Sequence, residues 1–173
     1  NEHSLHSPFV FEFYNNCIKG NSQFYDFKKI ELERKKLLEN NNSIDIQDFG
    51  AGSTINQSNK RLIKDIAKNS LKQKFLGQQL FRIVNYLKPK AILDIGSSLG
   101  ITTSYLASSN PQTNVVTLEG CKNTSKIARK TFYNLDLKNI NLVEGEFSKT
   151  LPQVINQIEN LDFVFFDGNH QYG

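Results

Sequence analysis

Methionine and tryptophan are absent from this 173-residue sequence, and cysteine occurs only twice. Cys17 and Cys121 lie far apart without a metal-binding spacing, which indicates two free thiols in a reducing compartment. Because position 1 is not methionine, we expect a fragment or a processed chain. No apolar run approaches the roughly 20 residues of a membrane-spanning helix, and no signal-peptide pattern opens the chain. These absences predict a soluble, cytoplasmic protein.

The positive charge of the chain is dispersed. The net charge of +4 comes from lysines scattered among asparagine and glutamate, with no arginine-rich block and no alternation of aromatic and basic residues. This pattern disfavours nucleic-acid binding. Apolar residues make up 38% of the sequence, which is enough for the core of one ordinary domain.

Short apolar segments alternate with amphipathic ones from residue 90 onward. The apolar runs predict strands at 91–95, 114–119, 140–144 and 161–167, and the intervening segments predict helices at 100–108, 122–135 and 148–158. Such short, continuous apolar strands are typical of a parallel sheet covered on both faces. We therefore predict an α/β fold with a Rossmann-like, doubly wound, mostly parallel sheet. Since a sheet that ended with the last of these strands would leave a bare apolar edge, we also expect C-terminal strands to be missing.

Residues 1–69 are predicted to form an N-terminal helical extension or cap, and residues 70–173 the Rossmann-like domain. Helices are expected over 8–19, 23–39, 62–67 and 75–87, and the Glu and Lys runs of the second helix are interpreted as a solvated face. The polar residues 40–43 mark the clearest boundary. An acid-and-glycine turn at 48–53 is interpreted mainly as a structural turn, in a loop that runs to Lys60 near the mouth of the site.

The most informative stretch begins where Asp94 lies near the end of the first apolar strand. Gly96 permits a sharp turn because it reaches positive φ easily, and Gly100 is expected to let the backbone approach a ligand. A strand, a tight turn and a helix together present free backbone N–H groups to that ligand. Ser98 replaces the middle glycine of a dinucleotide-binding turn, which disfavours a pyrophosphate. The pattern favours S-adenosylmethionine, a nucleoside that carries an amino acid and a positive charge.

The other strand ends offer further candidates, because ligands of open α/β sheets bind beyond the carboxyl ends of the strands. Glu119 can accept hydrogen bonds from two ribose hydroxyls, or it is an acid favoured by a helix N-terminus. The run 145–147 offers a polar group and an aromatic surface for adenine, or is only a turn. After the last strand, Asp167 is a candidate base or metal ligand, and His170 is a candidate general base or a solvated loop histidine.

Residues from about 70 to 173 resemble class I S-adenosylmethionine-dependent methyltransferases, in the branch of the catechol and caffeoyl-CoA O-methyltransferases. The resemblance rests on Gly77-Gln78 and on four motifs in order: ILDIGSSLGITTSYLA (92–107), VVTLEG (115–120), LVEGEF (142–147) and DFVFFDGNHQYG (162–173). It implies that S-adenosylmethionine is bound by Asp94, Gly96, Ser97, Ser98, Gly100, Glu119, Gly120, Gly145, Glu146, Phe147 and Asp167. In metal-dependent members the last aspartate binds a divalent ion such as Mg²⁺. The acidic pair that completes that metal site is absent from this sequence.

The resemblance implies O-methylation of a small-molecule or sugar-like acceptor, with Asp167 and His170 as the catalytic residues. We expect the binding partner to be the acceptor, and we expect no binding to nucleic acid or to a membrane. A homo-oligomer stays open. Two alternatives stay open: an NAD-type oxidoreductase, and a non-catalytic nucleotide-binding module.

Overall fold

A four-stranded parallel sheet forms the centre of the protein. The computed structural model describes residues 7–46 and 60–167. The strand order is β5-β4-β3-β6, and every neighbouring pair is parallel. The strands are β3 (Ala91–Ile95), β4 (Asn114–Glu119), β5 (Ile140–Glu144) and β6 (Phe163–Phe166). The predicted α/β class, the parallel sheet and all four strands are confirmed.

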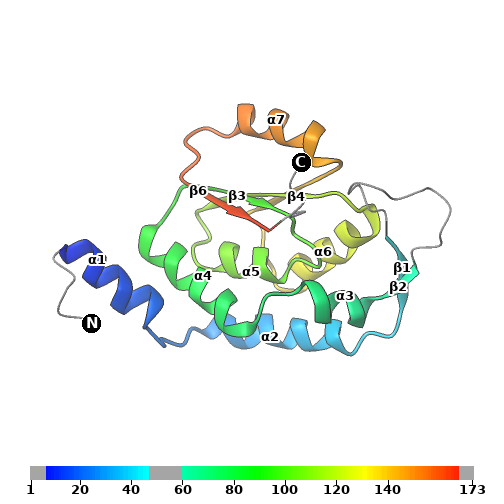
Figure 1. Cartoon of the computed structure of the whole chain (residues 1–173), viewed down its shortest axis with the longest axis horizontal. Coiled ribbons are helices and arrows are strands. Elements are labelled where there is room, and N and C mark those ends of the chain that lie inside the picture. The colour runs from blue at the N-terminus through cyan, green and yellow to red at the C-terminus, as the bar shows by residue number, and fades with distance from the viewer. Residues whose placement is uncertain (1–6, 47–59, 168–173) are drawn as a thin grey trace.

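Helices form layers on both sides of this sheet (Figure 1). One side carries α4 (Lys74–Leu87), α5 (Ile101–Ser108) and α6 (Lys122–Asn134), and the other carries α7 (Phe147–Gln157). Outside the first group lie α2 (Tyr25–Leu38) and α3 (Ile63–Ser70). The chain enters through α1 (Pro8–Phe13) and a π-helical turn, η2 (Tyr14–Ile18). None of these described helices is long and apolar enough to span a bilayer.

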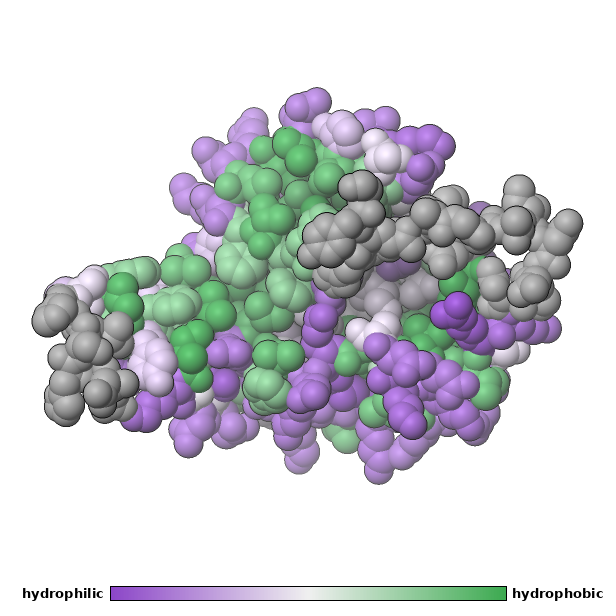
Figure 2. All heavy atoms as spheres, in the orientation of Figure 1, coloured by the Kyte–Doolittle hydropathy of each residue, from purple (hydrophilic) through white to green (hydrophobic). Residues whose placement is uncertain are grey.

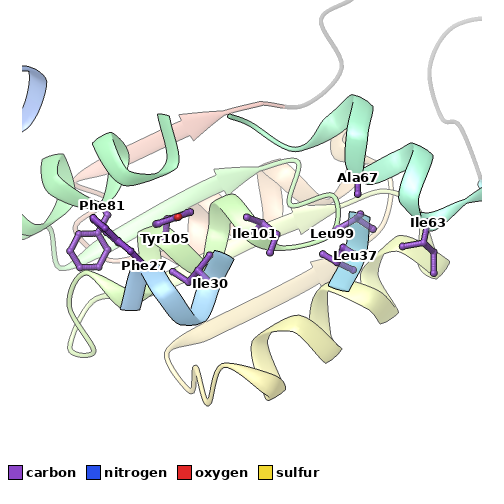
Figure 3. Packing of buried hydrophobic residues seen from close by; sticks show 9 residues of the cluster. All are labelled: Phe27, Ile30, Leu37, Ile63, Ala67, Phe81, Leu99, Ile101 and Tyr105. Carbon is purple, nitrogen blue, oxygen red and sulfur yellow. The ribbon is translucent and has the colours of Figure 1, made fainter. Parts of the chain in front are cut away.

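The outer helices share one apolar core with α5 (Figure 3). Phe27 and Ile30 of α2 pack in the same cluster as Tyr105 of α5, and all three side chains are buried. The ring of Phe27 meets that of Tyr105 edge to face at a centroid distance of 5.7 Å, a favoured aromatic geometry. The expectation that the Glu and Lys runs of α2 form a solvated face is wrong for Glu33, which is buried, as is its neighbour Arg34.

A short antiparallel hairpin precedes α3. Its strands are β1 (Ser43–Asp45) and β2 (Lys60–Leu62), with Ile44 opposite Arg61. The predicted loop up to Lys60 and the predicted helix start at Leu62 are therefore wrong, because both residues belong to β2. The acid-and-glycine turn at 48–53 lies outside the described residues.

Strand β6 forms one edge of the sheet, and its outer face is half exposed. Val164 and Phe166 point to that face and are 52% and 56% exposed. Figure 2 shows apolar side chains gathered in a band over α7, β6, α4 and α1. The prediction of a sheet covered on both faces is thus wrong at β6 within the described residues, since α7 packs on β4.

Candidate functional site

The glycine-containing turn after β3 is fixed to the neighbouring strand. The backbone N–H groups of Gly96 and Ser97 both donate to the Leu118 carbonyl, at 2.9 and 3.1 Å. Gly96 has φ +102° and Ser98 has φ +47°, so the backbone takes the left-handed region twice within three residues. The sharp turn predicted at Gly96 is present, and it leads directly into α5.

Gly100 is needed for packing. It has φ +85°, and a Cβ there would lie 2.7 Å from a ring carbon of Phe132 and 3.1 Å from the Cα of Ala128. Both neighbours belong to α6. Helix α6 thus gives one reason for a glycine at this position, and the close approach of the Gly100 backbone to a ligand stays a prediction.

Asp94 lies in the interior beneath the turn. Its side chain is 1% exposed, and Oδ2 accepts hydrogen bonds from the hydroxyls of Thr103 (2.6 Å) and Thr117 (2.8 Å). Burial raises the pKa of Asp94 to about 6, and repulsion from Asp167 adds to the rise, while the two hydroxyl bonds oppose it. A direct contact between Asp94 and the cofactor stays a prediction.

Glu119 ties the turn to the start of α6. Its Oε2 accepts from the Ser98 N–H at 2.8 Å, and its Oε1 accepts from the N–H of Cys121, the N-cap residue of α6, at 2.9 Å. Burial raises the pKa of Glu119, against the lowering effect of these backbone bonds. The alternative of an acid at a helix N-terminus is thus present. A backbone hydrogen bond from Gly120, which is half-buried, also reaches the Glu119 carboxylate. The ribose role of Glu119 stays a prediction, as does contact of Gly120 with the cofactor.

The end of β5 leads directly into the start of α7. Glu146 is the N-cap residue of α7, and its carboxylate binds the Ser148 hydroxyl (2.7 Å) and the Lys149 ammonium (2.8 Å). The same partners lower the pKa of Glu146. Phe147 packs against the core cluster of β3, β4 and α7. Gly145 turns the chain at φ +142°. Adenine binding by Gly145, Glu146 and Phe147 stays a prediction.

Asp167 lies directly beside the turn after β3. Its N–H donates to the Ile95 carbonyl at 2.9 Å, and its carboxylate pairs with the Lys72 ammonium at 2.6 Å. No group of three or more metal-ligating side chains occurs within residues 7–46 and 60–167, so the expected Mg²⁺ has no support there. His170, the candidate base, lies outside the described residues.

Sequence reasoning missed the linker between α3 and α4. The hydroxyl oxygen of Ser70, the last residue of α3, lies 2.8 Å from that of Ser98, and Lys72 in the linker reaches Asp167. The end of α3 and the linker together therefore bridge the turn and the end of β6. Only the position of residues 70–72 before α4 could have pointed to them. Ser98 lies 28 residues after Ser70, and Asp167 lies 95 residues after Lys72, so no local periodicity in the sequence indicates these contacts.

The residues around the turn fit S-adenosylmethionine. Two buried oxygen atoms, Ser97 Oγ and Asp94 Oδ1, have no hydrogen-bond partner in the structure. Buried polar atoms without partners are rare, and a polar ligand is one way to satisfy them. Glu119 adds a carboxylate that suits vicinal hydroxyls.

Comparison with known proteins points to methyltransferases. Residues 88–170 match a family described as "Putative methyltransferase". A tRNA (guanine-N(7)-)-methyltransferase of Mycoplasma mobile is 31% identical over 81 residues, which cover 47% of this chain and 40% of that protein. The chain thus spans less than half the length of this relative.

Solved structures share the fold at low sequence identity. An O-methyltransferase from Bacillus cereus in complex with SAH matches with TM-score 0.58 and 18% identity, over 90% of this chain and 59% of that one. TomG, an O-methyltransferase from Streptomyces achromogenes in complex with SAM, matches with TM-score 0.60 and 16% identity, over 86% and 55%. The chain therefore has the Rossmann-like fold of class I S-adenosylmethionine-dependent methyltransferases, and its residues 88–170 match a methyltransferase family.

Proposed function

We propose that this protein transfers a methyl group from S-adenosylmethionine to an oxygen atom of a small-molecule or sugar-like acceptor. The observation that carries the proposal is the turn after β3, where Ser97 Oγ and Asp94 Oδ1 are buried without partners. The match of residues 88–170 to a methyltransferase family and the O-methyltransferases among the similar folds support it.

The chain's own residues would hold and orient the donor. When bound, S-adenosylmethionine supplies a methyl group on a positively charged sulfur. The turn from Gly96 to Gly100 would bind the amino-acid end, and Glu119 the ribose. Gly145 to Phe147 would face the adenine. Because methyl transfer is an in-line displacement, alignment of donor and acceptor in a dry site supplies much of the acceleration. Asp167 and His170 would act on the acceptor hydroxyl, where His170 removes the proton.

Binding measurements test the first part of this proposal. In isothermal titration calorimetry on the full chain, we expect S-adenosylhomocysteine to give a heat of binding and NAD to give none. The oxidoreductase alternative is disfavoured because Ser98 replaces the middle glycine and its hydroxyl contacts Ser70. Binding of NAD without S-adenosylhomocysteine would overturn the proposal.

Methylation of tRNA is the second candidate function. It is favoured by the 31% identity over 81 residues to a tRNA (guanine-N(7)-)-methyltransferase. This match speaks against the expectation that no nucleic acid takes part. Incubation with S-adenosylmethionine labelled in the methyl group, once with a small-molecule extract and once with purified tRNA, separates the two candidates. Label in tRNA alone would replace the small-molecule acceptor.

A further inference from the structure

The linker between α3 and α4 crosses the candidate donor site and carries a positive charge into it. The Lys72 ammonium lies 2.6 Å from the Asp167 carboxylate at the end of β6. The neighbouring strand end is where the glycine-containing turn begins, and Ser70 contacts that turn through Ser98. The Lys72 side chain is 35% exposed, and its ammonium has three N–H donors, of which the pair with Asp167 needs only one.

The charges at this edge are complementary to a zwitterion. Asp94, Glu119 and Asp167 bring carboxylates to adjoining strand ends, close enough that Asp167 acts on the pKa of Asp94 and Asp94 on that of Glu119. The amino-acid end of the donor carries one ammonium and one carboxylate. The acidic groups suit the ammonium, and the Lys72 ammonium suits the carboxylate.

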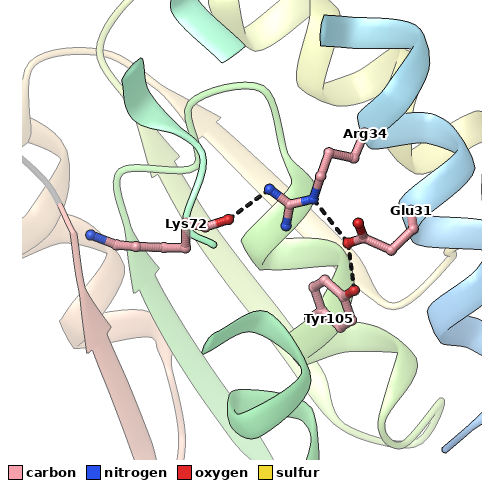
Figure 4. Close-up of polar contacts among 4 residues, drawn as sticks. All are labelled: Glu31, Arg34, Lys72 and Tyr105. Carbon is pink, nitrogen blue, oxygen red and sulfur yellow. Dashed lines mark hydrogen bonds and ion pairs between the residues drawn. The ribbon is translucent and has the colours of Figure 1, made fainter. Parts of the chain in front are cut away.

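Helix α2 fixes the position of Lys72 (Figure 4). Arg34 donates from Nη1 to the Lys72 carbonyl at 2.6 Å and from Nε to the Glu31 carboxylate at 2.9 Å. The same Glu31 oxygen accepts from the Tyr105 hydroxyl of α5 at 2.7 Å. The Arg34 side chain is 11% exposed, and charged groups this deeply buried are retained where they are paired. The backbone at Lys72 is therefore held between α2 and α5.

We propose that Lys72 binds the carboxylate of the donor's amino-acid end, and that Arg34 is the positioning residue that holds Lys72 in place. This inference rests on the proposed use of S-adenosylmethionine and assigns one more donor contact. The Lys72–Asp167 pair would open on binding, so that the Lys72 ammonium turns to the donor carboxylate. No covalent step is involved.

Two ligands that differ in the amino-acid end test this assignment. S-adenosylhomocysteine carries the amino acid, whereas 5′-methylthioadenosine has the same nucleoside with a methyl group in its place. In calorimetry on the full chain, we expect Lys72→Met to weaken S-adenosylhomocysteine binding about tenfold and to leave 5′-methylthioadenosine unchanged, since one charge-assisted contact is lost. Lys72→Arg should restore most of the affinity. The matched control is Lys74→Met, at the exposed lysine that begins α4.

Arg34 is tested by the same pair of ligands. We expect Arg34→Ala to weaken S-adenosylhomocysteine by severalfold, and the double variant with Lys72→Met to be no weaker than Lys72→Met alone. Equal losses for both ligands would show that the linker has only a structural role, and an unchanged affinity in Lys72→Met would overturn the assignment. If the wild-type chain binds neither ligand, the proposed function itself fails. If it binds both equally tightly, only the Lys72 contact fails.

Discussion

Replacement of Asp94 by asparagine should change how the stability of this protein depends on pH. Asparagine has nearly the same shape, and its carbonyl oxygen can accept from both Thr103 and Thr117, which now donate to Oδ2. The perturbation therefore removes the ionisation of a buried carboxyl and keeps both hydroxyl bonds.

The magnitude follows from the raised pKa of Asp94. Its ordinary value is 3.8, and burial in the folded protein raises it to about 6. Below both values the carboxyl is protonated in the folded and in the unfolded chain, so its burial carries no penalty for a charge. Above both values it is ionised in each, and the folded state carries a penalty of roughly 3 kcal/mol. The free energy of unfolding contributed by Asp94 thus falls as the pH rises through this window.

Urea unfolding at a series of pH values measures this effect. Because the chain has no tryptophan, far-ultraviolet circular dichroism is the suitable probe. Relative to the wild type, we expect the free energy of unfolding of Asp94→Asn to rise by about 3 kcal/mol between about pH 4 and pH 7. Asp136→Asn, at an exposed carboxylate, is the matched control. A difference between Asp94→Asn and wild type that stays constant across this range would refute the reasoning.

Three further outcomes follow from the site. Glu119→Ala should weaken S-adenosylhomocysteine at least tenfold in calorimetry, while Glu144→Ala, at the adjacent strand end, should not; equal affinities would exclude the ribose role. Gly100→Ala should lower the free energy of unfolding by roughly 2–4 kcal/mol in urea, because its Cβ would meet Phe132 at a strained positive φ; an unchanged midpoint would contradict this packing. His170→Ala should slow turnover and leave cofactor affinity intact, and equal turnover would demote His170 to a bystander.

The regular part of the fold was predictable from local pattern. The apolar run 91–95 predicted β3 because a central parallel strand is buried on both faces, and all five of its residues are buried. The spacing of apolar residues predicted α4 to within one residue of its start. The hairpin β1–β2 was missed because its strands have only three residues each and are mostly polar.

The contacts of the candidate site were less predictable. The positions of Asp94 and Glu119 at strand ends were correct, but a strand pattern does not tell whether a carboxylate faces solvent or lies under a helix. The Glu and Lys runs around Arg34 were interpreted as a solvated face, yet Arg34 binds a carbonyl 38 residues away. Such partners are fixed by how helices pack in space, which the periodicity of a single helix does not contain.

The shared cluster of α2 and α5 bears on how shortened versions of this protein should be made. The polar residues 40–43 look like a natural place to begin a truncated gene. A chain starting there would lose Phe27, Ile30 and Leu37, and the apolar side chains of Leu99, Ile101 and Tyr105 would be uncovered to water. Each large side chain so uncovered forfeits roughly 1.5–3 kcal/mol of burial, and the Tyr105 hydroxyl would lose its acceptor. Shortened versions that aim at the Rossmann-like sheet and its helices should therefore retain α2.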